Sequence, residues 1–113
     1  MNALQTKDLS DVLVCRHIHA YATKTREIHD KWQKSGQSFF DYFSAQGEEH
    51  PFPYETLATE TGCSEKVAFR AMERVHNKGL AESGVSLRTG WLTDKGVALL
   101  NASTPPSEGS ELP

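Results

Sequence analysis

The sequence predicts a mainly α-helical fold with one small two-stranded β-sheet, formed by a chain of 113 residues. Two observations predict the helices: apolar side chains recur every three or four residues, and Ser, Pro or Gly stands where a helix should begin or end. A third observation predicts the sheet, because two short runs with strand-forming residues flank a glycine-containing loop near the C-terminus. A chain of this length has room for one modest hydrophobic core.

The first predicted helix is long and amphipathic and covers residues 7–34. Gly36 follows it, at the place where a residue in the left-handed conformation commonly ends a helix. One seam of this helix, with spacings of four and three residues, consists of Val14, Ile18, Tyr21, Thr25, Ile28 and Trp32. At 1.5 Å per residue the helix would be about 42 Å long, more than a small domain can cover. We therefore expect the seam residues other than Thr25 to form a homodimer interface. The alternative is that the seam packs on the protein's own core.

Two short helices are predicted after this one. Ser38 would cap the first of them, with Asp41 as the acid of a capping box and three phenylalanines, Phe39, Phe40 and Phe43, as its buried side. Pro53 fits the first turn of the second, which covers residues 54–61 and ends at Gly62.

A third helix is predicted over residues 64–78, with Ser64 as its cap and Gly79 at its end. Its periodicity places a buried stripe on one side, made of Ala68, Ala71, Met72 and Val75. The opposite side would carry Lys66, Arg70, Glu73, Arg74 and Asn77.

Two strands, over residues 80–83 and 90–93, and a last helix over residues 94–101 complete the prediction. Helices followed by a two-stranded ribbon are the layout of a winged helix-turn-helix. We therefore divide the chain into an N-terminal helical segment (1–36), a winged helix-turn-helix domain (37–102) and a tail (103–113). The tail is rich in Pro, Ser and Glu and is expected to be disordered.

Charge is unevenly distributed along the chain, whose net charge is −3. Basic residues concentrate in segments 7–34 and 66–78, both predicted helices, whereas segment 41–60 has five acids and neither Lys nor Arg. A protein with a negative net charge is not expected to coat phosphates indiscriminately. One helix with a basic face can still meet nucleic acid.

A helix-turn-helix needs a small residue where its helices cross, a glycine in the turn and a capped second helix. The chain provides these in order, as Leu57-Ala58, Gly62-Cys63-Ser64, Arg70, Val75 and Gly79-Leu80. This pattern resembles the multiple-antibiotic-resistance regulator (MarR) type of transcriptional regulator, and Leu92-Thr93-Asp94-Lys95-Gly96 is similar to that family's step from the wing into the next helix. The resemblance covers roughly residues 39–100.

The resemblance implies a small, dimeric DNA-binding transcriptional regulator whose second helix enters the major groove of double-stranded DNA. The residues expected at the DNA are Ser64, Lys66, Val67, Arg70 and Arg74, with Arg88 on the wing. Val67 and Phe69 stand where the family has small polar residues, and packing at the edge of the core is the interpretation we favour for both. The wing is also shorter than in the family.

The alternative hypothesis is a winged-helix protein-interaction module that does not bind DNA, for example a phage- or plasmid-encoded inhibitor or adaptor. It would hold a protein partner through the side of Phe69 and Val67 or through the first helix. Exposed Phe69, and acids of segment 41–60 on the same face as the bases, would favour it.

No catalytic constellation is recognisable in the sequence, so we do not expect an enzyme. No metal or cofactor is expected either: His17 and His19 are only two residues apart on a helix, whereas metal-binding pairs need a spacing of three or four, and His29 has no partner ligand. Cys15 and Cys63 are expected as buried free thiols. The absence of a long apolar run and of a signal-like N-terminus predicts a cytoplasmic protein without membrane contact.

Overall fold

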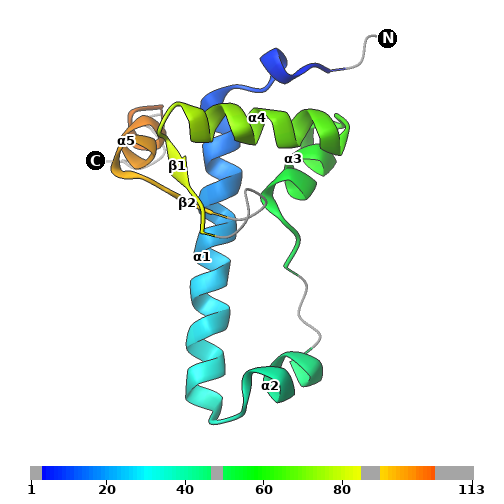
Figure 1. Ribbon diagram of the computed structural model, residues 1–113, viewed down its shortest axis with the longest axis vertical. Helices are drawn as coiled ribbons and strands as arrows, with labels where there is room; N and C mark the ends of the chain where they lie inside the picture. The colour runs from blue at the N-terminus through cyan, green and yellow to red at the C-terminus, as the bar shows by residue number, and fades with distance from the viewer. Residues whose placement is uncertain (1–3, 47–49, 85–89, 104–113) are drawn as a thin grey trace, which may run out of the picture.

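The computed structural model describes residues 4–46, 50–84 and 90–103 of the chain. These form a mainly helical fold with one small antiparallel sheet (Figure 1), as predicted. The elements in chain order are a 3-10 turn η1 (Thr6–Asp8), α1 (Asp11–Ser35), α2 (Phe39–Gln46), α3 (Pro53–Thr61), α4 (Glu65–Asn77), β1 (Ala81–Glu82), β2 (Trp91–Leu92) and α5 (Asp94–Ser103). Most of the tail, residues 104–113, lies outside the described residues.

Helix α1 begins four residues later than predicted. Ser10 is its N-cap, and its side-chain oxygen accepts a hydrogen bond from the Leu13 backbone at 3.1 Å. Leu9 is extended and only 2 % exposed, so the chain leaves the helical path to place this side chain in the core. At the other end Gly36 has φ +74°, the predicted left-handed cap.

The buried side of α2 differs from the prediction. Phe39 and Phe40 are 60 % and 77 % exposed, whereas Tyr42 is only 4 % exposed. The prediction for the two phenylalanines is therefore wrong, because α2 packs mainly on the end of α1 and offers only a narrow side to it. Ser38 does act as a cap, with its hydroxyl oxygen accepting a hydrogen bond from the Asp41 backbone at 3.1 Å.

Helices α3 and α4 end and begin as predicted. Pro53 occupies the first turn of α3, and Gly62 ends it with φ +81°. The Ser64 side chain then caps α4 by accepting a hydrogen bond from the Val67 backbone at 3.1 Å. The buried residues of α4 are the predicted stripe, Ala68, Ala71, Met72 and Val75.

The two strands pair antiparallel, with Ala81 opposite Leu92 and Glu82 opposite Trp91. Helix α5 begins two residues after β2 ends. It packs closely on Leu80, the residue before β1, because a β-carbon on Gly96 would lie 2.0 Å from the Leu80 carbonyl oxygen. A glycine is therefore required at this contact. Helix α5 extends to Ser103, two residues beyond the predicted end.

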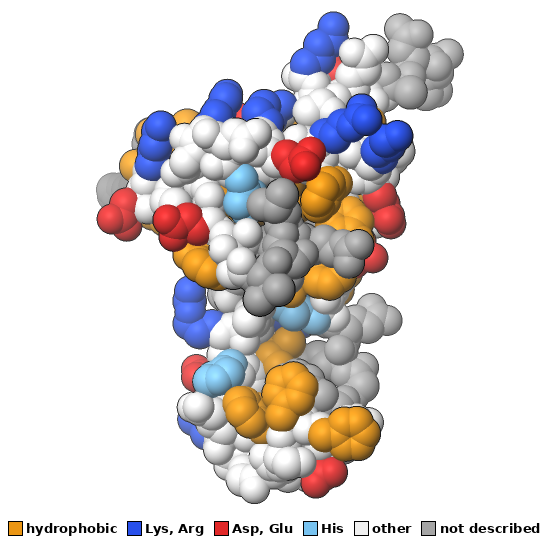
Figure 2. Space-filling view, viewed as in Figure 1, with side chains coloured by type: hydrophobic (Ala, Val, Ile, Leu, Met, Phe, Trp, Pro, Cys, Tyr) orange, Lys and Arg blue, Asp and Glu red, His pale blue; other side chains and the backbone are white. Residues whose placement is uncertain are grey.

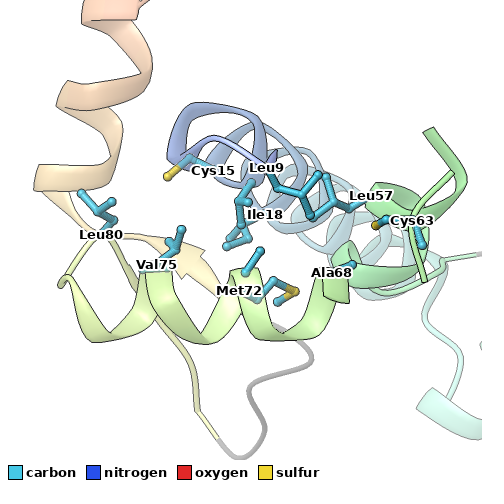
Figure 3. Close-up of a cluster of buried hydrophobic side chains, with 13 residues drawn as sticks. Leu9, Cys15, Ile18, Leu57, Cys63, Ala68, Met72, Val75 and Leu80 are labelled. Atoms are coloured by element: carbon cyan, nitrogen blue, oxygen red, sulfur yellow. The ribbon is translucent and has the colours of Figure 1, made fainter. Parts of the chain in front are cut away.

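One hydrophobic core joins the first helix to the rest of the chain (Figure 3). The close-up shows Ile18 of α1 beside Val75 and Met72 of α4, and Leu57 of α3 beside Leu9. The buried cluster consists of Leu9, Val14, Cys15, Ile18, Leu57, Ala58, Cys63, Ala68, Ala71, Met72, Val75, Leu80 and Ala81. Both cysteines are free and buried, as predicted.

This core corrects the expected dimer interface. Val14 and Ile18 have no exposed surface and Ile28 is only 5 % exposed within a single chain, so a second chain cannot reach them. Tyr21 and Trp32 are half-buried; Tyr21 stacks on His50 with ring centroids 4.1 Å apart, and Trp32 packs edge-to-face on Phe39 at 5.6 Å. The apolar seam residues therefore pack against other residues of the same chain, which was the alternative to a dimer interface.

Helix α1 is longer than the group of elements packed on its first half. Figure 1 shows α3, α4, β1, β2 and α5 around that half, while α2 lies at the opposite end of α1. None of the described helices is long and apolar enough to cross a membrane.

Candidate nucleic-acid interface

A stripe of four cations runs along the side of α4 that faces away from the core. They are Lys66, Arg70, Arg74 and Lys78, each four residues after the one before. Four-residue spacing places side chains one above another on a helix, and twelve residues span about 18 Å. Figure 2 shows Lys and Arg side chains gathered along the upper edge of the molecule, where α4 lies in Figure 1. We call these four residues the basic stripe.

The first two members of the stripe are available to a ligand. Lys66 and Arg70 are exposed, and neither has an ion pair or hydrogen bond to another residue in the described part of the chain. Ser64 is also exposed at the start of α4, although its oxygen already accepts the capping hydrogen bond. Two free cations and a helix N-terminus together favour an anion such as a phosphate.

Arg74 is bound within the protein. Its Nε donates to the Asp11 carboxylate at 2.8 Å, Nη1 donates to the Thr6 carbonyl at 2.9 Å, and Nη2 donates to the Leu9 carbonyl at 2.5 Å. The guanidinium thus holds η1 and the start of α1 against α4. Three of its five N–H groups make these bonds, and the Arg74 side chain is only 26 % exposed, so we remove it from the expected DNA contacts. The sequence placed it on the outer side of α4 but not beside its partners, which lie more than sixty residues away.

Asp11 also binds the last member of the stripe, since Lys78 Nζ lies 2.7 Å from the second carboxylate oxygen. Burial alone would raise the pKa of Asp11, but the Lys78 hydrogen bond and the positive charge of Arg74 hold that pKa below its ordinary value. Asp11 is therefore ionised at neutral pH and offsets part of the charge at this end of the stripe. Lys66 and Arg70, at the other end, have no ion pair with any residue that the structure describes.

Three cations at this edge were not among the predicted site residues. Lys7 on η1 and Lys95 on α5 are exposed, and Lys95 donates to the Lys78 carbonyl at 3.1 Å. Lys78 continues the four-residue spacing, so this spacing could have identified it. Lys7 and Lys95 reach α4 only through tertiary packing, and no local pattern marks them.

The remaining predicted contacts differ in position. Val67 is half-buried and packs against the core, and Phe69 is half-buried with its ring edge-to-face on Tyr54 at 5.8 Å. Both therefore occupy the edge of the core, the interpretation we favoured, and leave little apolar surface for a protein partner there. Arg88 lies outside the described residues.

Of the three histidines considered as metal ligands, only His17 lies between two helices. His17 lies between α1 and α3, with Nδ1 2.8 Å from the Thr56 hydroxyl and Nε2 2.9 Å from Glu60 Oε1, while His19 and His29 are exposed. Among the described residues no group of three or more His, Cys, Asp or Glu side chains could hold a metal ion.

Comparison of the chain with models of protein families, with curated proteins and with solved structures finds no match.

Proposed function

We propose that this protein is a small DNA-binding regulator that uses a winged helix-turn-helix. In this proposal α3 is the first helix of the motif, Gly62 to Ser64 form the turn, α4 is the recognition helix, and β1 and β2 form a short wing. The observation that carries the proposal is the basic stripe on the exposed side of α4, whose opposite side is fully buried.

The order and packing of the elements support the motif. Helix α3 packs on α4 through a turn whose glycine has a left-handed conformation, and both helices bury their small residues, Ala58 and Ala68, in the shared core. In the first two turns of α4, Lys66 and Arg70 stay exposed, while η1 also packs on this helix. A helix presented in this way fits the major groove, which is about 12 Å wide.

The two ends of α4 would make different contacts with DNA. Lys66 and Arg70 would contact phosphates or a guanine edge, for which Arg offers two parallel hydrogen bonds. Lys78 and Lys95, at the other end, would meet the backbone beyond the groove. Arg74 would act indirectly, by fixing η1 and Lys7 beside the recognition helix.

A titration of labelled random duplex DNA at about 50 mM salt tests the proposal. Non-specific binding by a DNA-binding domain should be measurable there at protein concentrations up to about 100 μM. Lys66→Ala and Arg70→Ala should each weaken binding and lower the slope of log K against log salt by about one unit, because each removes one phosphate contact.

Lys34→Ala is the matched control, since it removes the same charge from an exposed residue in the last turn of α1, at the end opposite α4. It should change binding little. The proposal fails if the wild-type protein does not bind duplex DNA under these conditions, or if Lys34→Ala weakens binding as much as Lys66→Ala. Either result would favour the protein-interaction module instead.

A further inference from the structure

A hollow lies between the middle of α1 and the strand β2, two elements that Figure 1 shows side by side. Its volume of about 540 Å³ is within the range of sites that hold small organic ligands. Aromatic rings line it from both elements, Tyr21 on α1 and Trp91 on β2, together with the nitrogen-bearing side chains of Arg26 and His29. Among the described residues that line it there is no acidic side chain.

Trp91 offers this hollow an unoccupied aromatic surface. Its side chain is 45 % exposed, and its ring contacts no other aromatic ring in the part of the chain that the structure describes. Tyr21 differs, because its ring already stacks on His50 with centroids 4.1 Å apart. A planar group that enters the hollow therefore finds its stacking partner in the indole of Trp91, the largest of the aromatic side chains.

The α1 side of the hollow carries a positive charge without a partner. Arg26 is exposed and makes no ion pair or side-chain hydrogen bond with the residues that the structure describes. His29 follows three residues later on the same side of the helix, and its ring nitrogens have no hydrogen bond within that same part of the chain. A guanidinium presents parallel N–H groups that match two oxygens of a phosphate, and an imidazole N–H can donate to a third. This side of the hollow therefore favours an anion with several oxygens.

We infer that this hollow binds a nucleoside monophosphate. The base stacks on Trp91, and the phosphate accepts hydrogen bonds from Arg26 and His29 on the α1 side. A ligand with both parts contacts α1 and β2 at once, whereas a free base or a free phosphate contacts only one of them. No residue of α4 lines the hollow, so this site is separate from the basic stripe and does not rest on the proposed DNA binding.

Titration calorimetry with AMP as the probe, in a phosphate-free buffer, tests the inference. AMP should bind the full chain with a Kd below about 1 mM. Adenosine lacks the phosphate and ribose 5-phosphate lacks the base, so each should bind at least about fivefold more weakly than AMP. Benzoate, a single ring with a carboxylate, should also bind at least about fivefold more weakly, because one ring covers less of the indole and a carboxylate offers fewer oxygens.

Variants of the two walls test the placement of the ligand. Arg26→Gln should weaken AMP binding at least about tenfold, because the phosphate loses its charged donor. Arg16→Gln is the matched control, since Arg16 is an exposed arginine of the same helix that does not line the hollow, and it should leave the Kd within about twofold. Trp91→Ala should weaken binding at least about fivefold, whereas Trp91→Phe keeps an aromatic ring and should stay within about threefold of the wild type. Trp91→Phe should also abolish the quenching of tryptophan fluorescence by AMP.

Three results would overturn the inference. The first is a Kd for AMP above about 1 mM, or benzoate binding as tight as that of AMP. The second is an equal loss in Arg16→Gln and Arg26→Gln, because binding would then follow net charge and not the hollow. The third is loss of AMP binding in Arg70→Ala, which would place the nucleotide on α4. Arg70→Ala should instead weaken only DNA binding and Arg26→Gln only AMP binding, so failure of this inference and failure of the proposed function give different results.

Discussion

Replacement of Arg74 by Ala should destabilise the protein although the side chain lies on the outer side of α4. Arg74 makes three hydrogen bonds, one of them to an ionised carboxylate, and joins η1 and the start of α1 to α4. A hydrogen bond to a charged group contributes about 1.5–3 kcal/mol when well shielded. The Arg74 and Asp11 side chains are 26 % and 23 % exposed, which reduces that value through solvent screening.

The expected loss is about 2 kcal/mol in the free energy of unfolding, or roughly 8 °C in Tm for a domain of this size. It stays below the sum of three hydrogen bonds for two reasons. Lys78 remains to pair with Asp11, and the Thr6 and Leu9 carbonyls can bind water once the guanidinium is gone.

Urea unfolding followed by circular dichroism measures this loss, and Arg70→Ala is the matched control. Both variants remove an arginine from the same helix, so the helix propensity changes equally. Arg70 makes no hydrogen bond in the described part of the chain, and its replacement should cost less than about 0.5 kcal/mol. If the two variants lose the same stability, the role given to Arg74 is wrong. A double-mutant cycle with Asp11→Asn should show coupling of about 1 kcal/mol between the two residues.

Three other predictions concern packing and titration. Gly96→Ala should cost more than about 2 kcal/mol by thermal unfolding, because the new β-carbon would overlap the Leu80 carbonyl oxygen, whereas Gly84→Ala, with nothing within 4 Å, should change stability little. Burial, with a smaller contribution from the charge of Asp11, raises the pKa of Cys15 to about 11. The folded protein should therefore resist alkylation of Cys15 at pH 8, and rapid alkylation without denaturant would contradict this expectation. The free energy of unfolding should also fall as pH rises above about 9, because the Cys15 thiol ionises more readily in the unfolded chain. Because the folded pKa of Asp11 is lowered, its contribution is complete above about pH 4 and is lost as pH falls through the folded pKa, so Asp11→Asn should flatten the acid side of the stability profile.

Local signals predicted the helix ends well, because a cap depends on a few neighbouring residues. Gly36, Gly62 and Gly79 all have positive φ where a helix was expected to stop, and Ser64 caps α4 through the predicted side chain. The buried stripe of α4 followed from periodicity alone, since one side of an amphipathic helix next to a core has to be buried.

Contacts between elements distant in the sequence could not be predicted in the same way. The periodicity of Val14 and Ile18 indicated a buried face of α1, but nothing local distinguishes the protein's own core from a second chain. Likewise, the position of Arg74 on a helical wheel does not reveal Asp11 or the carbonyls of η1, which reach it only when Leu9 enters the core. The exposure of Phe39 and Phe40 has the same origin, because hydrophobic residues in a short helix are buried only if another element covers them.

The place of α1 in the core has a consequence for synthesis of the protein. Val14 and Ile18 leave the ribosome about 40 residues before Leu57 and still earlier than Met72, the residues with which they share the core. At 5–20 residues per second, the apolar face of the first helix waits on the order of several seconds for its partners. The chain can complete its fold only once α4 has emerged, so a nascent chain stalled before residue 65 would carry an uncovered apolar helix and be a substrate for chaperones.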